Sequence, residues 1–510
     1  MKRSAKALVS ESSFDTYASA LKAKFKFKEA REHAYRPALQ HFVESMASGI
    51  EAINDAARIQ CGAPDFIVYK KRVPIGYIEA KDINKNLFKE EQSEQIRGYH
   101  SLGNLILTNY LEFRWYIDGE LRSEVRIGET KGATILFGEK EAEQLKHLFE
   151  SFLTAETKTI QTAGELAKRL ALTTSSIRDL IRRAFDHEQK TTGWLHRWLR
   201  AFSEVLISDL KPEAFADMFA QTLTYGFFAA RVHHKGNAEF SRFSAARILP
   251  KTNPFLRKLF AQFAGIDMPE TINWAVDEVV ELLKRADMDT ILKDFGAGTG
   301  KEDPVIHFYE TFLTAYDPEL RETRGVYYTP TPIVDFIVRS VDVVLATHFE
   351  KPKGLADDRT LILDPAVGTA SFLHKVIERI YERFAKNKGA WNSYVATCLL
   401  DRLFGFEILM APYAVSHLKI GLQLQATGYT FEQDQRLGVY LTNTLEEAAK
   451  KSQELLFEWV SDEANAASSI KKGRPIMVIL GNPPYSGHSM NRGRWISDLI
   501  KGYDGLRACS

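Results

Sequence analysis

The most constraining feature of this sequence is the alternation of short apolar runs with helical patterns that begins near residue 291. Four runs, TLILDPA, DRLFGFEI, GVYLTNT and PIMVILGNPPY, end on polar, Gly or Pro residues. Alternation of this kind predicts a parallel sheet with helices on its faces. Because ligands bind beyond the carboxyl ends of such strands, the residues that end these runs are the first candidates for a site.

Two regions with different residue patterns precede this one in the sequence. Strand patterns at 65–71, 74–82, 104–109 and 112–120 lie between helical patterns at 35–46 and 139–153. Residues 156–290 are almost wholly helical in pattern. We therefore predict an α/β multi-domain chain with a mixed-sheet domain at 1–155, an all-α connector at 156–290 and a partial Rossmann-like sheet at 291–510.

Composition limits the classes of function. The chain has 510 residues, with 67 Lys plus Arg and 66 Asp plus Glu, so bulk charge cannot carry nucleic-acid binding. Three distant cysteines, Cys61, Cys398 and Cys509, argue against a disulfide framework or a cysteine zinc site. The sequence holds no uncharged apolar stretch that could span a membrane and no signal-peptide pattern, so we expect a cytoplasmic protein without a membrane partner.

A local basic run lies within the helical region. Residues 231–258 hold seven Lys or Arg against one acid, Glu239. Two interpretations stand open: a solvated helical face, or a surface that contacts DNA phosphates.

The first candidate site joins Asp65, Glu79 and Lys81. Glu79 follows Asp65 by 14 positions, and residues 79 and 81 of one strand share a face. Two carboxylates and a lysine can thus converge across a hairpin, where Mg²⁺ would activate water and polarise a phosphate. The same spacing also occurs by chance in surface strands. The apolar setting GYIEAKD and the helical pair Gln95 and Tyr99 favour a site.

Together, CGAPDFIV, GYIEAKD and QIRGY resemble the PD-(D/E)xK nuclease domains of restriction enzymes that carry a Q-x-x-x-Y helix. The resemblance implies that Asp65 and Glu79 bind Mg²⁺ and that Lys81 and Gln95 take part in catalysis. Such domains often add a glutamate from the first helix to the metal site. Glu32 is our candidate for that ligand, and Glu44 is the alternative.

The second candidate site combines a glycine turn with a proline-rich turn. Residues 364–373, DPAVGTASFL, follow one strand and open a helix. Residues 482–485, NPPY, follow another, where Asn482 and Pro483 offer fixed acceptors for an exocyclic amine and Tyr485 can stack on a flipped base. A more glycine-rich segment, residues 294–301, follows a helical pattern and fails the phosphate-loop spacing, so we interpret it as a structural turn.

These motifs resemble the γ-class N6-adenine DNA methyltransferases, which use S-adenosylmethionine (AdoMet). The resemblance implies that Glu407 accepts from the ribose hydroxyls and that Asn482, Pro483 and Tyr485 hold the target base. Ala370 stands where the family usually has glycine, a change that is tolerable if its φ is negative. The remaining residues implied to bind AdoMet are Thr329, Pro330, Asp364, Ala366, Gly368 and Asn443.

The order of nuclease, helical connector and methyltransferase resembles fused type IIG restriction–modification enzymes. YGFFAAR and GNPPYSGHSMNRGRWISDLIK also resemble the single-polypeptide restriction enzymes that carry a helicase, but this sequence has no Walker motif. We expect Mg²⁺-dependent cleavage and adenine-N6 methylation of double-stranded DNA, in defence against foreign DNA.

Only 25 residues follow Tyr485, so we expect the later methyltransferase strands and the target recognition domain to be missing. A C-terminal partner polypeptide could supply them. The alternative function is a truncated or split, non-catalytic DNA-binding or assembly subunit that needs such a partner.

Overall fold

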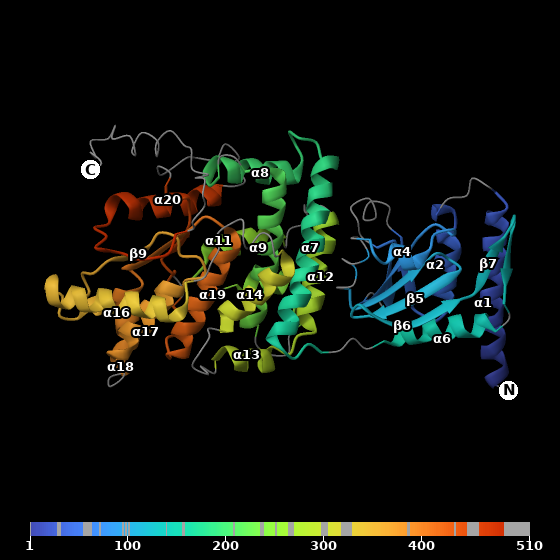
Figure 1. Cartoon of the computed structure of the whole chain (residues 1–510), viewed down its shortest axis with the longest axis horizontal. Helices are drawn as coiled ribbons and strands as arrows, with labels where there is room; N and C mark the ends of the chain where they lie inside the picture. Colours follow the sequence, from blue (N-terminus) through green and yellow to red (C-terminus); the bar gives the residue numbers. More distant parts are fainter. Residues whose placement is uncertain are drawn as a thin grey trace. The chain divides into compact units, whose positions relative to one another are not determined.

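The computed structural model describes residues 2–27, 32–54, 64–70, 73–93, 96, 99, 102–138, 140–155, 159–207, 210–234, 239–249, 252–263, 270–296, 304–317, 329–384, 388–432, 435–445 and 458–483. The chain divides into two compact units, Met1–Thr159 and Ile160–Ser510. Figure 1 shows the elements of each unit. The further division that we predict at residue 290 stays a prediction.

The first unit is built on a mixed sheet with strand order β1-β2-β3-β4-β5-β6. Strands β3 and β4 run parallel, and the other neighbours are antiparallel. The strands span Ile50–Ile53, Phe66–Lys70, Val73–Ala80, Asn104–Thr108, Glu112–Ile117 and Glu120–Arg126. The sheet packs against α2 (Arg36–Ser45) and α6 (Glu141–Thr154), and α1 (Lys2–Phe25) packs on α2.

All four strands expected between residues 65 and 120 are present, as β2, β3, β4 and β5. Asp118 and Gly119, the expected turn, have φ of 54° and 80° and join β5 to β6. A short hairpin of β7 (Gly128–Lys131) and β8 (Thr134–Phe137) follows. Neither β1 nor this hairpin was expected, because the sequence of each is short and half exposed.

The second unit begins with a helical assembly, as the sequence predicts. Its central helix, α9 (Pro212–His233), is buried along most of its length and packs on α7 (Ala163–His187) and α12 (Glu270–Lys284). Around it lie α8 (Trp194–Val205), α10 (Arg242–Ile248), α11 (Pro254–Phe263), α13 (Met288–Gly296) and α14 (Pro304–Tyr316). Helix α13 ends where the glycine-rich segment at 294–301 begins, so no strand of the described chain leads into that segment.

A parallel sheet forms the rest of the unit. Its strands are β9 (Ile362–Asp364), β10 (Leu403–Glu407), β11 (Val439–Leu441) and β12 (Val478–Ile479), in the order β11-β10-β9-β12. All neighbouring pairs are parallel. The helices that accompany it are α16 (Thr331–His348), α17 (Ser371–Glu382), α18 (Lys388–Tyr394), α19 (Met410–Ala426) and α20 (Glu458–Gly473). The predicted α/β multi-domain class is confirmed.

The helical assembly and the parallel sheet share a continuous interface. Helix α9 packs on α19, and α8 and α11 pack on α20. The ring of Trp459 in α20 lies 5.9 Å from that of Trp198 and 5.0 Å from that of Phe255. The helices that we expected to connect two domains thus contribute to the packing of the sheet domain. Among the described residues, no helix is long and apolar enough to cross a membrane.

Candidate functional sites

The structure brings together the three residues of the first candidate site. Asp65 directly precedes β2, and Glu79 lies near the end of the neighbouring strand β3. Both carboxylates are 3% exposed. The register pairs Phe66 with Ile78, which places Asp65 opposite Glu79, and the amide of Asp65 donates to Glu79 Oε2 at 3.2 Å.

Each carboxylate has a cationic partner. Lys81 Nζ donates to Glu79 Oε1 at 2.7 Å. Arg36, the first residue of α2, donates to Asp65 Oδ1, while Asp65 Oδ2 accepts from the amide of Ala80 at 2.8 Å. Sequence reasoning missed Arg36, since no pattern links it to a partner 29 positions away.

Burial and mutual repulsion shape the electrostatics of this pair. Burial and, to a smaller extent, the Asp65 charge raise the pKa of Glu79 and Lys81 lowers it, with the pKa standing at about 8. Two close buried carboxylates favour any cation that can lie between them.

The end of β3 is fixed by its neighbour β4. The amide of Lys81 donates to the carbonyl of Thr108 at 2.7 Å. Asn109 Nδ2 donates to the carbonyl of Lys85 at 2.8 Å, which anchors the loop after Lys81. The backbone that carries Lys81 is therefore positioned by two independent contacts.

The donor set suits a hard divalent cation only in part. Two carboxylates from adjacent strands offer oxygen ligands, and Mg²⁺ commonly binds one or two carboxylates and keeps several waters. Within the described residues, however, no group of three or more His, Cys, Asp or Glu is placed to hold a metal. A third protein ligand is therefore not part of the described site.

The two candidates for a third metal ligand are Glu32 and Glu44. The side chain of Glu32 and the whole of Gln95 lie outside the described residues. Glu44 Oε1 accepts from the amide of Ala52 at 3.1 Å and from Gln40 at 3.2 Å, so Glu44 binds the backbone of β1. Tyr99 is buried.

The second candidate site lies at the carboxyl ends of the parallel strands. The loop after β9 starts at Asp364, and Glu407 ends the neighbouring strand β10. Strand β12 pairs with the other side of β9, and the amide of Leu480 donates to the carbonyl of Leu363 at 3.0 Å. The loop that follows β9 and the turn at residue 482 therefore lie at the same end of the sheet, where its parallel strands have their carboxyl ends.

Backbone amides hold Glu407. Its Oε1 accepts from the amides of Ile408 and Leu409, both at 2.9 Å, and its Oε2 accepts from the amide of Gly368 at 2.9 Å. Burial raises the pKa of Glu407, and these amide bonds lower it. A carboxylate can accept about four hydrogen bonds, so Glu407 keeps capacity for one hydroxyl donor.

Asp364 joins the glycine loop to the turn at 482. Its Oδ1 accepts from the amide of Ala366 at 3.1 Å. Burial raises the pKa of Asp364 to about 7, and the Glu407 charge also raises it. A Cβ at Gly481 would overlap Asp364 Oδ1, so the residue before Asn482 must be glycine for this close approach.

The glycine loop contains two left-handed residues. Gly368 has φ of 53°, and a Cβ there would meet no atom closer than 4.0 Å, which leaves room over the loop. Ala370 has φ of 65° and is buried. The condition under which alanine would be tolerated here, a negative φ, is therefore not met, and Ala370 adopts a conformation that favours glycine.

Thr329 and Pro330 immediately precede α16, with Pro330 exposed as the residue that caps the helix. Asn443 follows β11. Its Oδ1 accepts from the amide of Leu445 at 3.0 Å, and its carbonyl accepts from Lys471 at 2.6 Å. Pro483 is exposed, whereas Tyr485 lies outside the described residues.

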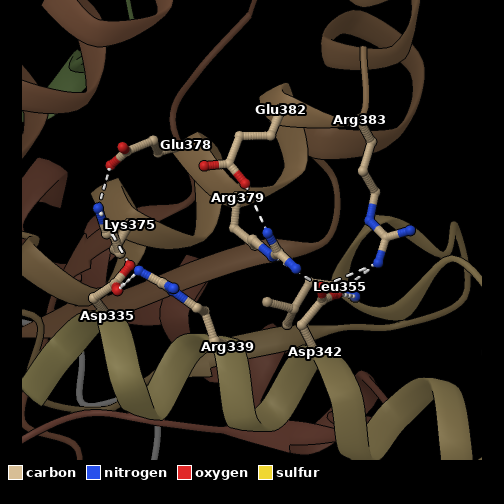
Figure 2. Close-up of polar contacts among 9 residues, drawn as sticks. All are labelled: Asp335, Arg339, Asp342, Leu355, Lys375, Glu378, Arg379, Glu382 and Arg383. Atoms are coloured by element: carbon tan, nitrogen blue, oxygen red, sulfur yellow. Dashed lines mark hydrogen bonds and ion pairs between the residues drawn. The ribbon is translucent and has the colours of Figure 1, made fainter. Parts of the chain in front are cut away.

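An ion-pair network fixes α16 against α17, as Figure 2 shows. Asp342 is 2% exposed and accepts from Arg379 at 3.0 Å, from Arg383 at 3.0 Å and from the amide of Leu355 at 2.9 Å. Closer to the start of α16, Asp335 pairs with Arg339 and with Lys375. Since α17 follows the glycine loop, the network positions the start of α16 relative to that loop.

Three of the seven basic residues at 231–258 make contacts within the protein. Arg231 donates to the carbonyl of Leu283 at 3.1 Å, and Arg242 donates to Asn273. Lys258 pairs with Asp462 at 3.1 Å. Lys235 and Lys251 lie outside the described residues, and both interpretations, a solvated helical face and a surface that contacts DNA phosphates, stay predictions.

Comparison with known proteins agrees with the second site. Residues 300–499 match the family model described as N-6 DNA Methylase. The second unit therefore contains a segment similar to N-6 DNA methylases, which confirms the methyltransferase resemblance. No curated protein matches the chain.

Several solved structures are similar to the chain. A DrdV–DNA complex is 20% identical with a TM-score of 0.48 and covers 97% of this chain and 46% of its own. The ATP-dependent type ISP restriction–modification enzyme LlaBIII bound to DNA is 20% identical, with a TM-score of 0.47, over 72% of this chain and 24% of its own.

A nuclease-deletion mutant of the type ISP enzyme LlaGI, in complex with a DNA substrate mimic, is 19% identical with a TM-score of 0.46, over 71% of this chain and 28% of its own. The chain thus spans less than half the length of each of these three structures.

Proposed function

We propose that this chain is a restriction–modification protein with two chemistries. In this proposal its first unit is a Mg²⁺-dependent DNA endonuclease, and its second unit binds AdoMet and methylates adenine N6 in DNA. The substrate of both is double-stranded DNA, and the role is defence against foreign DNA.

The observation that carries the nuclease proposal is the buried cluster of Asp65, Glu79 and Lys81. The two carboxylates would hold Mg²⁺, which would polarise the scissile phosphate and lower the pKa of a bound water. Lys81, held on Glu79, would orient that water or stabilise the charge that develops on the phosphate. Gln95, and Glu32 as a third metal ligand, remain part of the proposal from the sequence resemblance.

The proposal of methyl transfer rests on two observations. Part of the chain matches the methylase family, and the loop after β9 and the turn at residue 482 lie at the same carboxyl end of the parallel sheet. AdoMet, when bound, supplies an electrophilic methyl group. We propose that Thr329, Pro330, Asp364, Ala366, Gly368, Glu407 and Asn443 line its pocket. Glu407 has hydrogen-bonding capacity for a ribose hydroxyl, and Asn482 and Pro483 would accept from the adenine amine, with Tyr485 stacking on the base.

Two assays on the full chain test the two halves separately. Supercoiled plasmid should be nicked or linearised with Mg²⁺ and left intact with EDTA. Calorimetric titration should detect AdoMet binding, and Glu407→Ala should weaken it. Plasmid that stays intact with Mg²⁺ would remove the nuclease proposal, and absent AdoMet binding would remove the cofactor site.

A second candidate function is a non-catalytic DNA-binding or assembly subunit that needs a C-terminal partner. Strand β12 favours it, because within the described residues β12 pairs only with β9 and its Ile479 is 68% exposed. A partner polypeptide could extend the sheet at this edge. DNA binding in a gel-shift assay, without cleavage and without AdoMet binding, would favour this candidate.

A further inference from the structure

Arg36 pairs directly with Asp65, one of the two carboxylates proposed to bind the cation. Asp65 Oδ2 accepts from the backbone amide of Ala80, and the other carboxylate oxygen, Oδ1, faces a cationic side chain. The guanidinium of Arg36 donates to this oxygen. The side chain of Arg36 is 10% exposed, so solvent screens the pair only slightly.

The local charge count shows what a divalent cation would meet. With both carboxyls ionised, Asp65 and Glu79 contribute two negative charges and Arg36 and Lys81 two positive charges, so the charges of these two described ion pairs balance. A cation of charge two would leave an excess of two positive charges in a buried site. Release of Arg36 from Asp65 would halve that excess, whereas Lys81 pairs with the other carboxylate.

The helix start that carries Arg36 is held by a contact other than the pair with Asp65. Arg36 is the first residue of α2, and the preceding Tyr35 packs its ring 5.3 Å from that of Tyr110. The backbone at this point is therefore anchored by a neighbouring side chain, and the long arginine side chain can change rotamer while the helix start stays in place.

We propose that Arg36 acts as a displaceable counter-ion: its guanidinium neutralises Asp65 when no divalent cation is bound and competes with the cation for Asp65 Oδ1. This inference rests on the proposed cation site of the nuclease. It makes Arg36 a positioning residue that sets the affinity for the cation.

The test measures Mn²⁺ binding by calorimetry on the full chain, and thermal unfolding in EDTA and in Mn²⁺. Arg36→Gln removes a nearby like charge, so Mn²⁺ should bind about tenfold more tightly than in the wild type. The unfolding midpoint should fall in EDTA and recover in Mn²⁺ by more than the wild-type midpoint rises. Arg36→Lys should bind Mn²⁺ with intermediate affinity, since an ammonium pairs less well with a carboxylate than a guanidinium does.

Arg114→Gln is the matched control. The side chain of Arg114 is 11% exposed and pairs with Glu91 and Glu112, and its strand β5 is separated from β2 by β3 and β4. This variant should lose stability equally in EDTA and in Mn²⁺, with unchanged Mn²⁺ affinity.

The outcomes separate the inference from the proposed function. If the wild type binds Mn²⁺ and Asp65→Asn abolishes binding, the cation site stands. Equal or weaker binding by Arg36→Gln then overturns the counter-ion role alone. If Arg36→Gln does not fold in either condition, equal or weaker binding by Arg36→Lys overturns it. Absence of Mn²⁺ binding in the wild type overturns both.

Discussion

The two candidate sites stabilise their buried carboxylates in different ways. In the first unit, side chains neutralise them: Arg36 pairs with Asp65, and Lys81 pairs with Glu79. In the second unit, backbone amides surround Glu407, and one amide donates to Asp364. Charge in the first site can therefore be rearranged by moving side chains, whereas the second site is fixed by the path of its loops.

We expect the largest effect where the charge of a buried carboxylate is neutralised by a side chain. Lys81→Met leaves Glu79 without its ammonium partner and removes the group proposed to act on water or phosphate. We expect Mg²⁺-dependent plasmid cleavage to fall by at least about 100-fold, as when a preorganised electrostatic group is lost elsewhere.

Lys85→Met is the control for this prediction. Lys85 lies four residues further along, its side chain is 59% exposed, and it pairs with Glu90. Cleavage by this variant should match the wild type, and equal losses in both variants would show that Lys81 has no special role.

A second prediction tests whether the path of the loops depends on the network of Figure 2. Asp342→Asn removes the charge that faces Arg379 and Arg383, and both arginines are partly solvated. We expect the free energy of unfolding to fall by about 1–3 kcal/mol, the cost of weakening a buried charged acceptor. Denaturant unfolding measures this change, and calorimetry should show weaker AdoMet binding as the start of α16 shifts.

Asp335→Asn provides the comparison on the same pair of helices. Asp335 pairs with Arg339 and Lys375, but its side chain is 22% exposed, so the loss should be smaller, within the range of about 0–1 kcal/mol for surface pairs. An equal or larger loss for Asp335→Asn would contradict the ranking.

A third prediction concerns pH and the second unit. Burial, together with the nearby Arg436 charge, lowers the pKa of His417 to about 3. The unfolded chain takes up a proton near pH 6.5 and the folded chain does not, so this contribution to stability is lost as pH falls below 6.5.

The expected slope is about 1 kcal/mol of unfolding free energy per pH unit below pH 6. His417→Gln keeps a donor for the carbonyl of Val439 but cannot titrate, so its stability should fall less steeply with acid. If the unfolding free energies of the wild type and of His417→Gln fell equally steeply with acid, His417 would be excluded as the source of the pH dependence.

The smallest effect is expected at Ala370. Its φ of 65° strains an L-residue, and glycine relieves that strain, so Ala370→Gly should stabilise the second unit by about 1 kcal/mol. Ala414→Gly, in the buried interior of α19, should instead destabilise it. Destabilisation by both substitutions would show that the left-handed position is not strained.

The contrast between the two sites also explains what the sequence could predict. Period-two and apolar patterns placed β2, β3, β9 and β10, and the residues that end these strands are those the structure gathers. Pairing across the hairpin of β2 and β3 follows from short-range geometry, so the approach of Asp65 to Glu79 was predictable.

Other features depend on tertiary packing and left no local signal. The Arg36 contact joins a helix start to a strand start, and many other cations of the chain could have taken that place. The φ of Ala370 is imposed by the loop between β9 and α17, against the preference of alanine. The packing of α9 on α19 required knowing which faces meet in two helices that are buried along most of their length.

The most direct test of the cation site is a crystal structure of the full chain with Mn²⁺, using the anomalous signal of the metal. We predict a peak bonded to carboxylate oxygens of both Asp65 and Glu79, with Arg36 withdrawn from Asp65. A Mn²⁺-containing crystal with no anomalous peak there, or with a peak bonded to neither carboxylate, would contradict the proposed nuclease site.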